Sequence, residues 1–183
     1  MNRRPALHWG GARQAALRFT WPAAMAGGLR KVISGGEAGV DRAALDAALA
    51  LGYTAGGWCR RGRAQKARVP DRVPLRETSS NRYSQRAALN VRDADATLIV
   101  YNGAPDDGAR LTQEIALRMG KPVIAVDLDD RGGYDQARAW LAQTAPRILN
   151  VAGAGDSRNV GVYARSFAML VRLLGPAQRE AQK

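Results

Sequence analysis

The chain has 183 residues and a formal net charge of +12, from 28 basic and 16 acidic side chains. Its single cysteine, Cys59, excludes an internal disulfide, and its single histidine, His8, argues against a Ser-His-Asp triad or a histidine metal site in the folded core. The single cysteine fits a reducing compartment and offers no metal-site spacing, so we expect a cytoplasmic protein without a bound metal. No apolar run approaches the roughly 18 residues of a membrane span, so we expect no membrane partner.

Residues 1–29 are predicted to be an N-terminal appendage. This segment carries Arg without acids in residues 1–24, has several Gly and Pro, and shows no long periodic stretch. Met25 stands just before the first apolar run, which is typical of a mis-assigned start. We therefore expect one ligand-binding domain over residues 30–176 with a tail at 177–183, and we expect residues before Met25 to be dispensable.

From Lys31 onward, short apolar runs alternate with helical patterns. Apolar runs near 31–33, 53–55, 97–101, 123–126 and 148–151 predict strands, and a helix is expected over about 82–92. A long polar loop is expected over about 56–78. This alternation predicts an α/β fold, a Rossmann-like parallel sheet with helices on both faces in a single domain, whose ligands bind at the carboxyl ends of the strands.

The first candidate site is the glycine-rich run after the first strand. Glycines let the backbone turn tightly, and the N-terminus of the following helix attracts anions. A tight turn without a ligand explains the pattern equally well. Asp41 either holds a ligand or interacts with the helix dipole, and Glu37 would repel phosphate unless it points away. The candidate ligand-binding residues here are Ser34, Gly35, Gly36, Gly39, Asp41 and Arg42.

The second candidate is a basic loop at residues 58–72, with six basic residues and one acid. It is interpreted either as a solvated loop or as a lid over an anionic ligand, in which Arg60, Arg61 and Arg63 supply charge and Trp58 stacks on a base.

Further candidates follow the later strands. Asn102, Gly108, Thr112 and Ser157 could contact a phosphate, although Ser157 could equally cap the last helix. Asp107 is a plausible N-cap of the helix that contains Glu114. Glu114 and Asp41 are the candidate catalytic carboxylates, but a solvent-exposed Glu is the commoner outcome for a helix.

Five motifs in one order carry a resemblance to a known family. They are Ser34-Gly35-Gly36-x-x-Gly39-Val40-Asp41-Arg42, Gly56-Gly57-Trp58-Cys59-x-x-Gly62-Arg63, Asn90-Val91-Arg92-Asp93-x-Asp95, Gly120-Lys121-Pro122, and Leu149-Asn150-Val151-Ala152-Gly153 with Gly161-Val162-Tyr163. Together they resemble the putative molybdenum-carrier family, the circularly permuted YpsA-like branch of the superfamily that contains the LOG nucleotide hydrolases and DprA.

The resemblance covers about residues 30–175 and implies a Rossmann-like domain with a crevice for a nucleotide or for a cofactor such as molybdenum cofactor. The family usually has Gln-Thr where this chain has Glu37-Ala38, and Gly-Gly-Thr where it has Asp107-Gly108-Ala109. These departures put phosphate affinity at both loops in doubt.

Three hypotheses follow. The first is a binding protein for a phosphorylated, nucleotide-like ligand or cofactor. The second is a LOG-like hydrolase of the nucleotide N-glycosidic bond, and the third is a single-stranded nucleic-acid-binding protein. A homo-oligomer through a helical face is an expectation from the wider group. The first hypothesis predicts that Gly36→Val abolishes ligand binding with little effect on the fold.

Overall fold

The computed structural model describes residues 28–64, 69–70, 72–156 and 160–175. Within these ranges the chain forms strands and helices in alternation. The elements are β1 (Lys31–Ile33), α1 (Val40–Ala50), β2 (Thr54–Cys59), β3 (Leu75–Glu77), α2 (Tyr83–Asp93), β4 (Ala96–Tyr101), α3 (Asp107–Arg118), β5 (Val123–Asp127), α4 (Gly133–Thr144), β6 (Ile148–Gly153) and α5 (Val162–Leu174).

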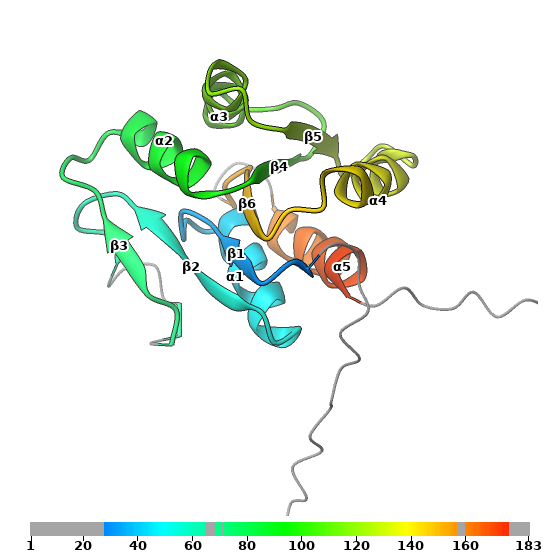
Figure 1. Cartoon of the computed structure of the whole chain (residues 1–183), viewed down its shortest axis with the longest axis horizontal. Helices are drawn as coiled ribbons and strands as arrows, with labels where there is room; N and C mark the ends of the chain where they lie inside the picture. Colours follow the sequence, from blue (N-terminus) through cyan, green and yellow to red (C-terminus); the bar gives the residue numbers. More distant parts are fainter. Residues whose placement is uncertain (1–27, 65–68, 71, 157–159, 176–183) are drawn as a thin grey trace, which may run out of the picture.

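The strands form one parallel sheet in the order β3-β2-β1-β6-β4-β5 (Figure 1). The chain moves outward from β1 to β2 and β3, crosses to β4 and β5, and returns to place β6 beside β1. The direction of winding therefore reverses next to β1 and β6, where open α/β sheets form a crevice at the carboxyl ends of their strands. The predicted fold class is confirmed.

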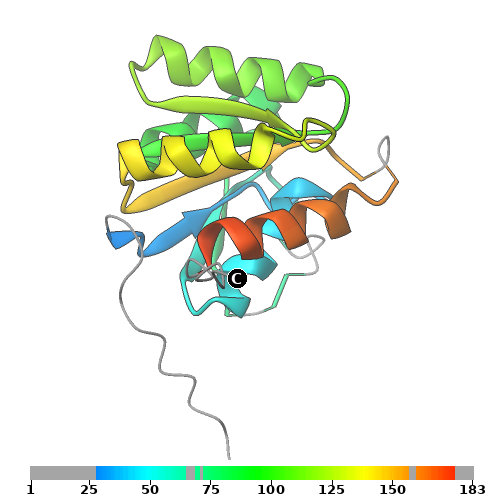
Figure 2. The ribbon, with the colours of Figure 1, turned by 90° about the vertical axis from the view of Figure 1, so that its right-hand side faces the viewer.

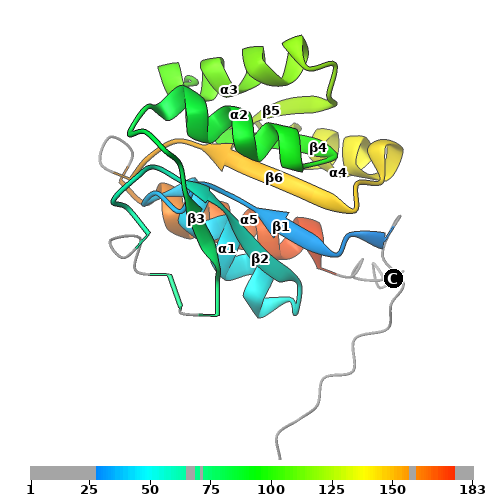
Figure 3. The same cartoon turned by 60° about the vertical axis from the view of Figure 1, so that its left-hand side comes forward.

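Helices cover both faces of the sheet. α1 and α5 pack together on one face, and α2 and α3 pack together on the other (Figures 1 and 3). α4 lies against β5 and beside α5 (Figure 2). Leu45, Leu98, Leu149 and Leu170 are fully buried between the sheet and its helices, and burying each such side chain stabilises the fold by about 1.5–3 kcal/mol.

The region expected to be a long loop contains more regular structure than its sequence indicates. β2 continues to Cys59, and a third edge strand, β3, pairs with it. Asn90 of α2 fixes the end of β2, because its Oδ1 accepts the Trp58 N–H at 2.9 Å and its Nδ2 donates to the Trp58 carbonyl at 2.9 Å. These two hydrogen bonds hold the end of β2 in an extended conformation, which its glycines alone would not favour.

The predictions for residues before Met25 and for the tail fall on residues 1–27 and 176–183, which lie outside the described part of the chain. Among the described helices, none has both the length and the apolar character needed to span a bilayer.

Candidate functional site

The β1–α1 loop and the β6–α5 loop meet at the carboxyl edge of the sheet. The Val40 N–H donates to the Ala154 carbonyl at 3.1 Å, and the Asp156 N–H donates to the Ala38 carbonyl at 3.2 Å. Gly39 permits this junction, since its φ is +103° and a Cβ there would clash with the Ala154 carbonyl. The glycine therefore fixes where the N-terminus of α1 begins.

Four backbone N–H groups of the β1–α1 loop lack internal acceptors, two on each side of Glu37, whose own N–H faces the Asp41 carboxylate. Within the described ranges, no acceptor is found for the N–H groups of Gly35, Gly36, Ala38 and Gly39, and no side chain caps α1. Successive free N–H groups before a helix form a concavity that binds anions, and the helix dipole adds to the attraction. The chemistry of this loop suits a phosphate or another oxyanion.

The backbone of Gly36 has a φ of +71°, in the left-handed region. A β-branched residue is strained there. We therefore expect Gly36→Val to distort the backbone of the loop. A loss of ligand binding in this variant would not separate a blocked site from a distorted loop.

A buried ion pair lies directly beneath the loop. Arg86 Nη1 of α2 is 2.6 Å from Asp41 Oδ2 of α1, and the two side chains are only 4% and 3% exposed. A Cβ on Gly35 would overlap the Arg86 guanidinium. Gly35 is thus required by the close approach of the backbone to this pair.

A line of contacts connects the pair to α3. The Arg86 guanidinium lies 4.4 Å from the centre of the Tyr83 ring. The Tyr83 hydroxyl is 3.3 Å from Thr112 Oγ1, which donates to the Gly108 carbonyl at 2.8 Å. A Cβ on Gly108 would lie 2.9 Å from the Tyr83 ring, so this glycine admits the ring.

Burial dominates the electrostatics of the pair. It raises the pKa of Asp41 above the ordinary carboxyl value, and the charge of Arg86 opposes this rise. For Arg86, burial lowers the pKa, but the charge of Asp41 together with Tyr83 outweighs burial and raises it, so the guanidinium stays charged. Asp41 Oδ1 and Arg86 Nε have no hydrogen-bond partner among the described residues. Within the described part of the chain, one acceptor on Asp41 and one donor on Arg86 are therefore left without a partner beneath the loop.

Glu37 points away from the free N–H groups and toward the basic loop. Arg60 Nε donates to Glu37 Oε1 at 2.9 Å, and Arg63 Nη2 lies 3.6 Å from Glu37 Oε2. Arg61 is exposed, and residues 65–68 and 71 of this loop lie outside the described part. Glu37 thus joins the basic loop to the glycine-rich loop.

Two predicted residues serve the fold near the site. Ser34 is fully buried, and its hydroxyl donates to the Val151 carbonyl at 2.6 Å. Arg42 donates to Asp46 at 2.7 Å, one helical turn along α1. Ser157 lies outside the described residues.

Three further candidates have partners away from the ion pair. The Trp58 indole donates to Asp93 at the far end of α2 at 2.7 Å, Asn102 accepts from Arg165, and Glu114 is exposed with Arg118 3.4 Å away. The structure therefore brings together a smaller set of the predicted residues. That set is Gly35, Gly36, Gly39, Asp41, Gly108 and Thr112.

Arg86 and Tyr83 are absent from the sequence-based prediction. The signal available was spacing, because Tyr83, Arg86, Ala87 and Asn90 fall on one face of the expected helix. An arginine on the apolar side of an amphipathic helix indicates a buried partner.

No cluster of three His, Cys, Asp or Glu side chains suited to a metal ion occurs in the described ranges.

Comparisons with known proteins agree with the fold. Residues 32–174 match the model of the circularly permutated YpsA SLOG family. A crystal structure named as a putative molybdenum carrier protein from Syntrophus aciditrophicus SB is similar, with 33% identity and a TM-score of 0.74. The similarity covers 83% of this chain and 98% of that one. None of the curated proteins matches the chain.

Proposed function

The chain belongs to the circularly permuted YpsA SLOG family, and on that premise we propose that it binds a phosphorylated, nucleotide-like small molecule at the carboxyl edge of its sheet. The observation that carries the proposal is the set of free N–H groups at Gly35, Gly36, Ala38 and Gly39. A phosphate seated there would accept these N–H groups and meet the N-terminus of α1.

Two groups of cations support the same ligand class. Arg86 lies under the loop, and the charge of the neighbouring Asp41 keeps its guanidinium protonated against the effect of burial. Arg60 and Arg63 lie beside the loop, where Glu37 holds them. A ligand phosphate would compete with the Glu37 carboxylate for these two guanidinium groups.

The similar crystal structure is named a molybdenum carrier, and molybdenum cofactor is the cargo that this name suggests for the present chain. The donors at the site are amide N–H groups and guanidinium groups, which suit a phosphate. We therefore propose that such a cargo is held through its phosphate group. Cys59 is buried and lies in β2, so its thiol is not offered to the cargo.

The hydrolase alternative lacks a supporting observation in the described residues. Glu114 is exposed on α3, and Asp41 is covered and paired with Arg86. A carboxylate that activates water must lie within hydrogen-bond reach of it. Binding without hydrolysis is the function that this geometry favours.

The test begins with native mass spectrometry of the purified full chain, to identify a retained small molecule. Titration calorimetry with AMP and GMP then compares wild type with Ala38→Asp and with Ala38→Ser as a matched control. Ala38 is exposed, so both variants should fold. Ala38→Asp should weaken binding by about tenfold or more, because its charge lies beside the phosphate. Equal affinities for the two variants would contradict the proposal.

A second variant of the same loop is expected to strengthen binding rather than weaken it. Glu37→Gln with Ala38→Thr removes an acid and adds a hydroxyl next to the free N–H groups. It also releases Arg60 and Arg63 for the ligand. We expect tighter AMP or GMP binding than in wild type, and unchanged or weaker binding would count against a phosphate at this position.

The basic loop has its own test. Replacing Arg60, Arg61 and Arg63 with Ala should weaken nucleotide binding by about tenfold or more, since charged hydrogen bonds contribute about 1.5–3 kcal/mol each. Binding of a single-stranded oligonucleotide should stay weak in both proteins. If the wild type instead binds single strands tightly at physiological salt and the variant loses only that, the nucleic-acid hypothesis replaces this one.

A further inference from the structure

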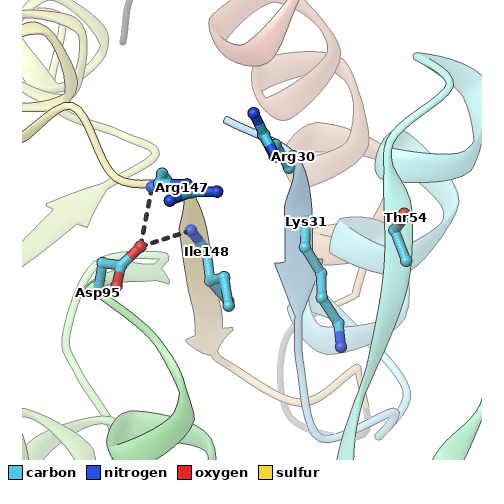
Figure 4. A pocket seen from close by; sticks show the side chains of 6 residues that line it. All are labelled: Arg30, Lys31, Thr54, Asp95, Arg147 and Ile148. Atoms are coloured by element: carbon cyan, nitrogen blue, oxygen red, sulfur yellow. Dashed lines mark hydrogen bonds between the residues drawn. The ribbon is translucent and has the colours of Figure 1, made fainter. Parts of the chain in front are cut away.

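A second cationic pocket lies at the opposite, amino-terminal edge of the sheet. It encloses about 380 Å³ and is open to solvent. The residues that line it come from the starts of β1, β2 and β6 and from the turn before β4 (Figure 4). They are Arg30, Lys31, Thr54, Asp95, Arg147 and Ile148.

The strand register explains how three of these residues, Lys31, Thr54 and Ile148, lie side by side. Lys31 pairs with Thr54 on one side and with Ile148 on the other. Residues paired across parallel strands point to the same face of the sheet. On the face of the sheet that carries α2 and α3, α3 packs against β4, β5 and β6, and α2 packs against β2 and β6. The pocket lies at the starts of β1, β2 and β6.

The pocket carries more positive than negative charge. Within the described part of the chain, Arg30, Lys31 and Arg147 form no ion pair. Among the described lining residues Asp95 is the one acid, and its Oδ2 already accepts the N–H groups of Arg147 at 2.9 Å and Ile148 at 2.8 Å (Figure 4). These hydrogen bonds tie the carboxylate to the start of β6 and reduce its effective charge.

We propose that this pocket binds a compact, multiply charged phosphate chain such as a diphosphate or triphosphate. Its volume falls in the range of small-molecule sites. Three cations and the Thr54 hydroxyl supply donors, and the lining residues within the described part of the chain include no aromatic ring on which a base could stack. The occupant that the lining fits is therefore inorganic polyphosphate rather than a nucleic acid strand.

Nuclear magnetic resonance with inorganic tripolyphosphate tests this on the full chain. We expect shifts of the amide signals of Arg30, Lys31 and Ile148, which separate this pocket from the loop at Gly36 and Gly39 on the other edge. If tripolyphosphate does not bind this pocket, the amide signals of Gly36 and Gly39 can still be used to test the proposed nucleotide site independently. An absence of shifts at the three pocket amides at physiological salt would overturn the inference.

Three variants make the test specific. Arg147→Gln should weaken tripolyphosphate binding by about threefold to tenfold, which is the effect of losing one partly solvent-exposed ion pair with the ligand. Arg138→Gln removes the same charge from an exposed position on α4, and it should leave the affinity unchanged. Asp95→Asn should strengthen binding, because its amide oxygen can still accept both N–H groups while the negative charge is gone.

Two results would refute the proposal. One is an equal loss of affinity in Arg147→Gln and Arg138→Gln, which would show a general charge effect. The other is much tighter binding of a single-stranded oligonucleotide that depends on Arg147, which would identify a nucleic acid as the occupant.

Discussion

Arg86→Met is expected to be among the most destabilising single changes near the candidate site. The substitution keeps an unbranched, largely apolar stem but leaves Asp41 buried, charged and without its partner. Both side chains are nearly inaccessible, so solvent screens the loss very little. Breaking a buried ion pair in this way costs about 3–5 kcal/mol of unfolding free energy. For a domain of this size, that corresponds to a fall in Tm of about 6–20 °C.

Urea denaturation followed by circular dichroism measures the effect. With a slope of about 2 kcal/mol per molar urea, the midpoint should fall by about 1.5–2.5 M. Asp41→Asn alone should also be costly, because Arg86 is then the uncompensated charge. The double variant should lose about 2 kcal/mol less than the sum of the two single losses, since no buried charge remains.

The pH dependence gives an independent check with a definite sign. Burial raises the pKa of Asp41, so the folded state favours its protonated form more than the unfolded state does. A carboxyl group whose pKa is raised on folding stabilises the folded state at a pH below its pKa in the unfolded state. This stabilisation is lost as the pH rises through its pKa in the folded state. The difference in unfolding free energy between wild type and Arg86→Met should therefore become smaller as the pH falls from about 8 toward about 5. Additive single and double variants, with a deficit independent of pH, would refute the reasoning.

Three other changes have distinct signatures. Ser34→Ala should lower the unfolding free energy by about 1–2 kcal/mol, because its buried hydrogen bond to the Val151 carbonyl is lost, while calorimetry with AMP should show unchanged affinity. Lys121→Met should cost about 0.5–1.5 kcal/mol in urea denaturation, because Lys121 Nζ donates to two carbonyl oxygens at the end of α2. Hydrogen bonds from the backbone of Gly62 and then Ala64 hold the pKa of Glu77 below 4.5. Their contribution is present above pH 4.5 and lost as the pH falls through the lowered folded value, so amide exchange at Ala64 should accelerate there.

The fold was accessible from sequence because its signals are local. The run at 97–101 is apolar and rich in β-branched residues, as in a strand buried on both faces, and it forms the core of β4. β3 has no such signal, since Leu75-Arg76-Glu77 lacks an apolar pattern. It is a strand because β2 offers it a paired edge at Gly57 and Trp58. Pairing partners at an edge are a property of the folded sheet, which no short window of sequence contains.

The site was only partly accessible for the same reason. Glycines before a helix marked the loop, since Gly36 and Gly39 adopt positive φ values that the motif implied. Arg86 was missed because its burial depends on Asp41, which lies 45 positions earlier in the chain. The N-cap of α3 shows a smaller error, because Asp106 and not Asp107 accepts the Ala109 N–H, at 2.8 Å. Adjacent acids at a helix start are distinguished only by backbone geometry.

The structure shows why Glu37 and Asp107 need not prevent phosphate binding. Glu37 turns toward Arg60 and Arg63, and Asp107 is fully exposed with Arg110 3.8 Å away. Neither carboxylate occupies the concavity formed by the free N–H groups of the β1–α1 loop. Their repulsion of a phosphate is therefore reduced by distance, by neighbouring cations and, for Asp107, by solvent. Both acids are thus compatible with an anion at the glycine-rich loop, and the Glu37→Gln with Ala38→Thr variant measures how far Glu37 weakens the binding of a phosphate there.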